Sequence, residues 1–257
     1  MIGEYLRPTS VDEALELLED KERNLKPLGG GTRISRQKGS NFGVVDLQHA
    51  GIDLIEKRGH RRIVGAAAKL HALLDHTDVL PEVKRAILID ASENIRNMAT
   101  LGGWLVTSSG RSILTTLLLA LDSSLTWEPG EEKVRLGNWL PLRYQEPPGL
   151  LMTSVEWGLQ PKIAFEYVAR SPKDLPIVVA TAAQWENGRT RVALGGYGNA
   201  PVIAMDGPDD SGVDVASKDA YHDAGDQWAT AEYRREVAAK LALRCLDRID
   251  ELKESEA

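Results

Sequence analysis

Residues 25–33 read Leu-Lys-Pro-Leu-Gly-Gly-Gly-Thr-Arg, a short extended stretch that runs into three consecutive glycines. Because glycine has no side chain, the backbone N–H groups of Gly29, Gly30 and Gly31 can point into one concavity that binds phosphate oxygens. The hydroxyl of Thr32 adds a further donor at the end of this run. A purely structural turn is the alternative, because glycine-rich turns are common.

A second glycine segment lies at residues 100–103, which read Thr-Leu-Gly-Gly and follow Asn-Ile-Arg-Asn-Met-Ala at 94–99. Thr100 offers another hydroxyl, and Gly102 and Gly103 allow a second close approach of the backbone. We expect this segment to be a turn between regular elements, like the first. Neither segment has the glycine spacing of a Rossmann fingerprint or of a P-loop, so both of those nucleotide-binding motifs are excluded.

Helices and strands are expected on both sides of the glycine segments. Ser10 and Glu13 form a capping box that begins a short amphipathic helix, and Ser112 can cap a strongly apolar one. Asn187-Gly188 is a strong hairpin signal. Further helices are expected at 81–91 and 231–252, and strands at 25–28, 44–47, 62–66, 151–159, 176–185 and 190–194. Alternating strands and helices of this kind indicate an α/β organisation.

Two breaks divide the chain, one rich in Pro and Gly at residues 146–149 and one at 160–161, and we place a domain boundary near residue 161. Residues 206–226 hold seven Asp against one Lys, which predicts a solvated, mobile loop. The five histidines show no metal-ligand spacing, and no nucleophile–base pair is identifiable.

Composition excludes several classes of function. The chain of 257 residues has 31 basic and 38 acidic residues and a formal net charge of −7, which argues against nucleic acid as the main partner. A single cysteine, Cys245, cannot form an intramolecular disulfide or a cysteine-ligated metal centre by itself. The first residues lack a signal-peptide pattern, and no apolar run is long enough to cross a membrane. We therefore expect a cytoplasmic protein.

Taken together and in this order, the two glycine segments resemble the FAD-binding subunit of the molybdenum hydroxylases, the family of xanthine dehydrogenase and carbon monoxide dehydrogenase. The resemblance covers nearly the whole chain. It is carried by residues 27–32, 44–47, 95–103, 118–122, 168–176, 192–198 and 231–235.

The resemblance implies an α+β fold in two domains. The first, residues 1–161, would be a two-lobed FAD-binding domain of the PCMH type, with a break between its lobes near residues 55–60. The second, residues 162–257, would be a small α+β domain of the CO dehydrogenase flavoprotein type, with a three-stranded antiparallel sheet and helices.

The resemblance also implies the site. The FAD pyrophosphate would be held on one side by Leu28, Gly29, Gly30, Gly31, Thr32 and Arg33. It would be held on the other side by Thr100, Leu101, Gly102 and Gly103. Met152 would pack beside the flavin ring. No catalytic residue and no metal ligand is expected in this chain.

In such enzymes the substrate is oxidised by a large subunit with a molybdenum cofactor, and a small iron–sulfur subunit with [2Fe-2S] clusters relays the electrons. The FAD subunit passes them to an external acceptor. The resemblance therefore implies FAD as the cofactor here and both other subunits as partners, without membrane insertion or nucleic acid.

Four residues depart from the family pattern. Arg33 stands where an acidic or small polar residue is usual, and Trp104 where Asn is common. Ile113 replaces an Asp that binds the ribityl chain, and Glu166 lies where a Lys often approaches the flavin. These changes keep open an alternative, a flavin-free structural subunit that kept the fold and lost the cofactor site.

Overall fold

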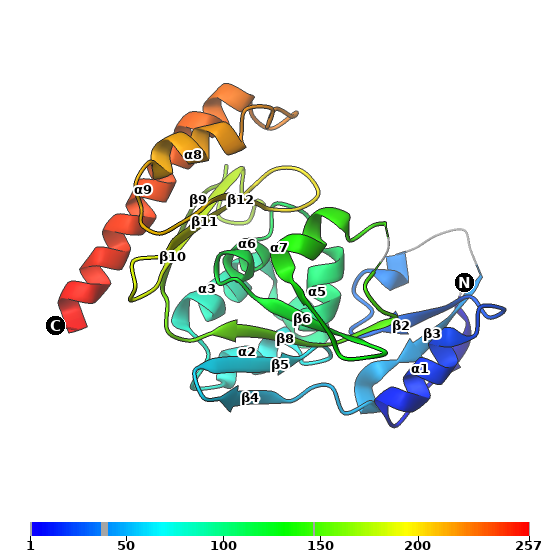
Figure 1. The fold of residues 1–257 in the computed structure, drawn as a ribbon. Helices are drawn as coiled ribbons and strands as arrows, with labels where there is room; N and C mark the ends of the chain where they lie inside the picture. The colour runs from blue at the N-terminus through cyan, green and yellow to red at the C-terminus, as the bar shows by residue number, and fades with distance from the viewer. Residues whose placement is uncertain (1, 37–40, 146, 257) are drawn as a thin grey trace. The chain divides into compact units, whose positions relative to one another are not determined.

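The computed structural model describes residues 2–36, 41–145 and 147–256 (Figure 1). The chain forms two compact units, each assembled from separate stretches of sequence. The first unit consists of Met1–Val79, Ala91–Thr107 and Ser124–Trp157, and the second of Leu80–Asp90, Ser108–Ser123 and Gly158–Ala257.

The first unit contains a three-stranded parallel sheet in the order β1-β3-β2, formed by Ile2–Leu6, Phe42–Asp46 and Leu25–Leu28. Helix α1 (Val11–Glu19) packs on this sheet (Figure 1). The predicted helix cap at Ser10 is confirmed, because the hydroxyl of Ser10 accepts from the backbone N of Glu13 at 3.1 Å. The carboxylate of Glu13 in turn accepts from the backbone N of Thr9 at 2.7 Å.

A five-stranded sheet completes the first unit, in the order β4-β5-β8-β6-β7. Its strands are β4 (Ile55–Arg58), β5 (Arg61–Gly65), β6 (Ser124–Glu128), β7 (Glu132–Arg135) and β8 (Leu151–Gly158). The first unit also contains short helices: α2 (Leu70–Asp75), α4 (Glu93–Met98), α5 (Leu101–Thr107), α7 (Leu136–Trp139) and the 3-10 turns η1 (Ile34–Arg36), η2 (Leu47–His49) and η3 (Leu140–Leu142).

The second unit is built on a four-stranded antiparallel sheet in the order β12-β11-β10-β9. The strands are β9 (Lys162–Val168), β10 (Val178–Gln184), β11 (Thr190–Gly195) and β12 (Val202–Gly207). The helices are α3 (Pro81–Asp90), α6 (Ile113–Ala120), α8 (Val213–Ala220) and α9 (Ala231–Glu256). The hairpin between β10 and β11 is confirmed, with Gly188 at a positive φ of 88°.

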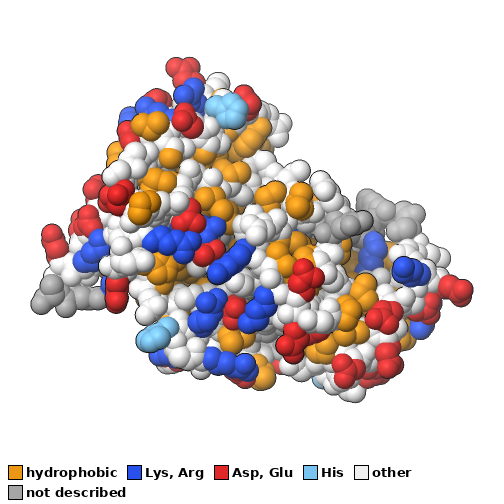
Figure 2. Space-filling view, viewed as in Figure 1, with side chains coloured by type: hydrophobic (Ala, Val, Ile, Leu, Met, Phe, Trp, Pro, Cys, Tyr) orange, Lys and Arg blue, Asp and Glu red, His pale blue; other side chains and the backbone are white. Residues whose placement is uncertain are grey.

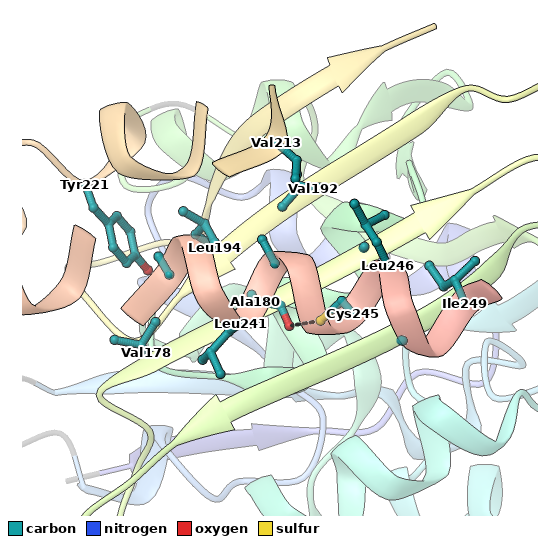
Figure 3. Packing of buried hydrophobic residues seen from close by; sticks show 14 of the residues in the cluster. Val178, Ala180, Val192, Leu194, Val213, Tyr221, Leu241, Cys245, Leu246 and Ile249 are labelled. Carbon is teal, nitrogen blue, oxygen red and sulfur yellow. Dashed lines mark hydrogen bonds between the residues drawn. The ribbon is translucent and has the colours of Figure 1, made fainter. Parts of the chain in front are cut away.

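The core of the second unit lies between α9 and the sheet (Figure 3). Helix α9 places Leu241, Cys245 and Ile249, which recur every four residues, against the strands, whereas Tyr233 and Leu252 nearer its ends are exposed. The thiol of Cys245 lies 3.4 Å from the carbonyl oxygen of Ala180 on β10 (Figure 3). Burial raises the pKa of this thiol to about 12, so Cys245 is an unreactive core residue.

The expected three-stranded antiparallel sheet of the second domain is wrong. The antiparallel sheet has four strands, and the three-stranded sheet of this chain is parallel and lies in the first unit. Two of its four strands, β9 and β12, are not among the strands expected from the sequence, and Val202 and Ile203 of β12 are exposed at the sheet edge. Strand β12 runs into the acidic segment, and a half-exposed edge strand carries little periodic signal.

The predicted mobile loop at residues 206–226 is also wrong, because α8 lies within it. Val213, Ser217 and Tyr221 recur every four residues and are buried, whereas Asp214 and Asp219 lie on other sides of the helix. The Asp-rich composition therefore describes the solvated face of a short helix, while a stripe of only three residues packs inward.

Candidate functional site

The first glycine segment leaves the end of β2 as a tight turn and leads into η1. Gly31 adopts a positive φ of 70°, which favours glycine, and its carbonyl oxygen accepts from the backbone N of Ser35 at 3.3 Å. The six predicted residues of this turn line a small cavity of about 80 Å³, namely Leu28, Gly29, Gly30, Gly31, Thr32 and Arg33.

The two glycine segments lie in direct contact, although they are far apart in the sequence. A Cβ atom on Gly30 would lie 2.5 Å from the carbonyl carbon of Met98 and 2.9 Å from Cα of Ala99. A Cβ atom on Gly29 would lie 2.5 Å from the Thr100 hydroxyl oxygen. These two glycines are therefore required for close packing of the turn against residues 98–100.

The second segment is not the turn that we expected: it is the first turn of α5, and Thr100 precedes this helix. The hydroxyl of Thr100 accepts from the backbone N of Gly103 at 3.2 Å, and its carbonyl oxygen accepts from Trp104 at 2.8 Å. The backbone N atoms of Leu101 and Gly102 donate to the carbonyl oxygens of Ala68 and Ala66, both at 2.9 Å. These four amides are already bonded, so this segment contributes close packing and not a second nest for an anion.

A larger cavity of about 390 Å³ adjoins the small one. Both are lined by Gly29, Arg33, Thr100 and Gly103. The larger cavity is also lined by Gly102 and by Met152 of β8. Leu101 is fully buried in α5 and is not among the residues that line either cavity. Apart from Leu101, the structure therefore brings all the predicted site residues to these two adjoining cavities.

Two tryptophans that the sequence did not single out form part of the larger cavity wall. Trp127 of β6 and Trp139 of α7 pack with their ring centroids 5.5 Å apart and their planes tilted by 52°. They are 5% and 3% exposed, and the Nε1 atom of each is buried without a hydrogen-bond acceptor in the described part of the chain. No motif surrounds either residue, so no local signal predicted them.

The charge of the cavity lining is opposite to that of the chain. Lys26, Arg33 and Arg143 line the larger cavity, and no Asp or Glu is among its described lining residues. Arg143 donates to the carbonyl oxygen of Leu105 at 3.1 Å and to the hydroxyl of Tyr144 at 2.9 Å. On the face drawn in Figure 2, by contrast, acidic and basic side chains are interspersed. A cavity lined with cations in a chain of net charge −7 favours an anionic ligand.

The other residues that depart from the family pattern lie elsewhere. Trp104 is half-buried and lines neither cavity. Ile113, in the second unit, is fully buried in the first turn of α6. Glu166, also in the second unit, forms an ion pair with Arg248 at 2.7 Å.

Asp90 binds the N-terminus of α6. Its carboxylate accepts from the backbone N atoms of Ile113 at 3.0 Å and Leu114 at 2.9 Å, and from the hydroxyl of Ser112 at 2.7 Å. Burial nevertheless raises the pKa of the Asp90 carboxyl to about 6.

The described residues contain no group of three or more His, Cys, Asp or Glu side chains that could hold a metal ion. None of their helices combines the length and the apolar character that crossing a membrane requires.

Residues 1–156 match the family model described as FAD binding domain in molybdopterin dehydrogenase. The uncharacterized protein YgfM of Escherichia coli (strain K12) is 26% identical over 198 residues, which cover 76% of this chain and 75% of that protein. The carbon monoxide dehydrogenase medium chain of Afipia carboxidovorans is 25% identical over 280 residues, which cover 95% and 96% of the two chains.

Among solved structures, reconstituted CO dehydrogenase from Oligotropha carboxidovorans superimposes with a TM-score of 0.82. The superposition covers 97% of this chain and 98% of that chain at 23% sequence identity, so the likeness establishes a shared fold.

Proposed function

Since the chain belongs to the family of FAD-binding domains of molybdopterin dehydrogenases, we propose that it is the FAD-binding, electron-transferring subunit of a molybdenum hydroxylase. In this role it takes electrons from an iron–sulfur subunit and passes them to an external acceptor. The protein is thus an oxidoreductase subunit. The single observation that carries the proposal is the pair of adjoining cavities at the glycine turn, lined by cations.

The residues at the cavities fit FAD in two respects. Gly29, Gly30 and Gly31, with Thr32 and Arg33, offer backbone and side-chain donors and a positive charge to the pyrophosphate. The larger cavity, of about 390 Å³ and lined mainly by apolar groups, has the size and character of sites that enclose planar cofactor rings.

When bound, FAD supplies the redox chemistry, and the protein binds it, orients it and excludes water. Met152 and Leu151 of β8 would lie against the ring, while the glycine turn would hold the phosphates. Leu101, Gly102 and Gly103 would support the site through close packing and not through free amides.

Partner subunits follow from the same proposal. The relative from Afipia carboxidovorans is by name the medium chain of a carbon monoxide dehydrogenase. A large subunit with the molybdenum cofactor and a small iron–sulfur subunit are therefore the proposed partners of this chain. A single buried cysteine supports this assignment, because it leaves iron–sulfur ligation to another chain. We retain residue 161 as the proposed end of the FAD-binding domain, and the cytoplasmic location stays a prediction.

The test is FAD binding by the purified chain, followed by visible absorption and by calorimetry. We expect about one flavin per chain. Arg33→Glu should weaken FAD binding about tenfold or more, because it removes a charge-assisted contact and adds repulsion. Arg58→Glu is the matched control: Arg58 is an exposed cation on β4 that lines neither cavity.

The result that would overturn the proposal is a folded chain that binds no FAD, either alone or in complex with its partner subunits. That result would support the second candidate, a flavin-free structural subunit. The observation that favours the second candidate is that the amides of residues 101–104 are already bonded within the protein.

A further inference from the structure

We propose that the second unit carries a docking surface for an acidic segment of a partner subunit, formed by Trp228 and three cations of that unit: Arg111, Arg170 and Lys173. The inference rests on the proposed function, because it assigns a contact surface to the partners named there. It concerns residues outside both glycine segments, and the described lining residues of the two cavities include none of the four.

The first argument is an exposed tryptophan that is held in place. Trp228 is 38% exposed and lies in the segment between α8 and α9. The carboxylate of Asp226 accepts from the backbone N atoms of Trp228 at 2.8 Å and Ala229 at 3.1 Å. The buried Arg234 donates to the same carboxylate oxygen at 2.8 Å. A tryptophan on a rigid support is a strong anchor for a partner protein, because little conformational freedom is lost when it is covered.

The second argument is the positive charge around the Trp228 ring. The guanidinium carbon of Arg170 lies 4.4 Å from the ring centroid, and that of Arg111 lies 5.2 Å from it. Two like charges on one ring repel each other. A carboxylate brought to this ring by a partner therefore interacts favourably with both guanidinium groups.

Carboxylates of the chain itself compensate only part of this charge. Asp174 lies 3.5 Å from Arg170, and the exposed Lys173 precedes Asp174 in the chain. Arg111 donates to two backbone carbonyl oxygens. Within the described part of the chain, neither Arg111 nor Lys173 forms an ion pair with a carboxylate. Two cations therefore remain uncompensated in a chain of net charge −7, which favours an acidic partner.

A second tryptophan–arginine pair of the same unit provides a contrast. The guanidinium carbon of Arg189 lies 4.6 Å from the centroid of the Trp185 ring. The guanidinium of Arg189 also pairs with Asp206 at 2.9 Å and with Asp122 at 3.2 Å. The charge on this ring is thus compensated within the chain, so the pair offers little attraction to an acidic segment and serves as the matched control.

The third argument is the composition of the surface, which fits a protein partner. Leu175 is 50% exposed, and its carbonyl oxygen accepts from Arg111, so an apolar side chain adjoins the cations. Tryptophan and arginine are enriched in protein–protein interfaces relative to the rest of the protein surface. An exposed aromatic ring with apolar and cationic neighbours therefore suits a partner segment that carries both apolar and acidic side chains.

The experiment measures the affinity of the full chain for the large and the small partner subunit by calorimetry. We expect Trp228→Ala and Lys173→Glu each to weaken binding of one of these subunits by about tenfold or more, because the first removes the anchor and the second reverses an exposed charge. Trp185→Ala should change the affinity by less than about twofold, because its ring lies in a charge-compensated pair. Thermal unfolding checks that each variant is folded.

The dependence on salt tests the acidic character of the partner segment. Binding by the wild-type chain should weaken as sodium chloride is added, and Lys173→Glu should reduce this dependence. Wild-type binding that does not vary with salt, or wild-type affinity for both subunits in Trp228→Ala and Lys173→Glu, would overturn this inference and leave the proposed function intact. A wild-type chain that binds neither subunit would overturn the proposed partners as well.

A measurement on the wild-type chain guards against variants that do not fold. Hydroxyl-radical oxidation of Trp228, followed by mass spectrometry, should fall by about fivefold or more when the partner subunits are bound, because the exposed ring is covered. Oxidation of Trp185 should stay nearly the same. Equal oxidation of Trp228 in the free chain and in the complex would refute the inference.

Discussion

Replacing Gly30 by Ala tests whether the glycine turn is held in place by its contact with the segment before α5. The new Cβ atom would lie 2.5 Å from the carbonyl carbon of Met98 and 2.9 Å from Cα of Ala99. Both contacts are with backbone, which cannot rotate away as a side chain can. Ordinary contacts between carbon atoms require about 3.5–4.0 Å, so the turn must move by about 1 Å.

This displacement has two expected consequences. Overpacking of a tight contact costs about 1–3 kcal/mol, so the free energy of unfolding should fall by that amount. A movement of about 1 Å is also enough to misalign donors that must lie within hydrogen-bond distance of a phosphate. FAD affinity should therefore fall by at least tenfold.

The assay is urea unfolding combined with calorimetric titration of FAD. Gly3→Ala is the matched control, because a Cβ atom on Gly3 would meet nothing within 4 Å and its φ is not positive. We expect Gly3→Ala to leave stability and FAD affinity unchanged. If Gly30→Ala kept both wild-type stability and wild-type affinity, the argument that this turn is positioned by close packing would be refuted.

Three other predictions concern the second unit. Because burial raises the pKa of Asp90 from 3.8 to about 6, the folded state binds a proton more tightly than the unfolded state. The unfolding free energy of the wild type relative to Asp90→Asn should therefore fall by about 2 kcal/mol between pH 4 and pH 7, and a difference that does not vary with pH would contradict this. Arg234 is fully buried, pairs with Asp226 at 2.8 Å and donates to three carbonyl oxygens. Arg234→Met should therefore lower the free energy of unfolding in urea by about 3 kcal/mol or more, and a loss below 1 kcal/mol would be inconsistent with this pairing. Because burial raises the pKa of Cys245 to about 12, a thiol reagent at pH 8 should label it only after unfolding, and rapid labelling of the native chain would disprove its burial.

Several features could be predicted from the sequence because they depend on residues close together in the chain. The Ser10 cap acts within one helical turn, and Asn187-Gly188 determines its own hairpin. The inward face of α9 follows from a four-residue spacing that repeats along most of the helix. The glycine turn at residues 29–31 was recognised for the same reason, because its backbone freedom is a property of the residues themselves.

The conformation of the second glycine segment could not be predicted from its own residues. Thr100 and the two glycines after it permit either a turn or a helix start. Hydrogen bonds from Leu101 and Gly102 to Ala68 and Ala66 accompany the helical form, and these partners lie more than thirty residues earlier in the chain. Strands β9 and β12 and helix α8 were missed because their burial depends on contacts with other elements and not on a pattern within each segment: β9 pairs with β10, β12 pairs with β11, and α8 packs against α9.

The residues that line the larger cavity could be identified only from the tertiary structure. Trp127 lies in a strand and Trp139 in a short helix, and neither has a spacing that points to a ligand. Pairing of β6 with β8 places Trp127 beside Met152, and the packing of the glycine turn against residues 98–100 brings Arg33 and Thr100 to the same cavity. The amino-acid sequence by itself determined the caps, the hairpin, the glycine turn and the family, since each depends on local geometry or on a recognisable order of motifs. The part of the larger cavity formed by Trp127, Trp139 and Met152 depends on contacts between distant segments, such as the pairing of β6 with β8.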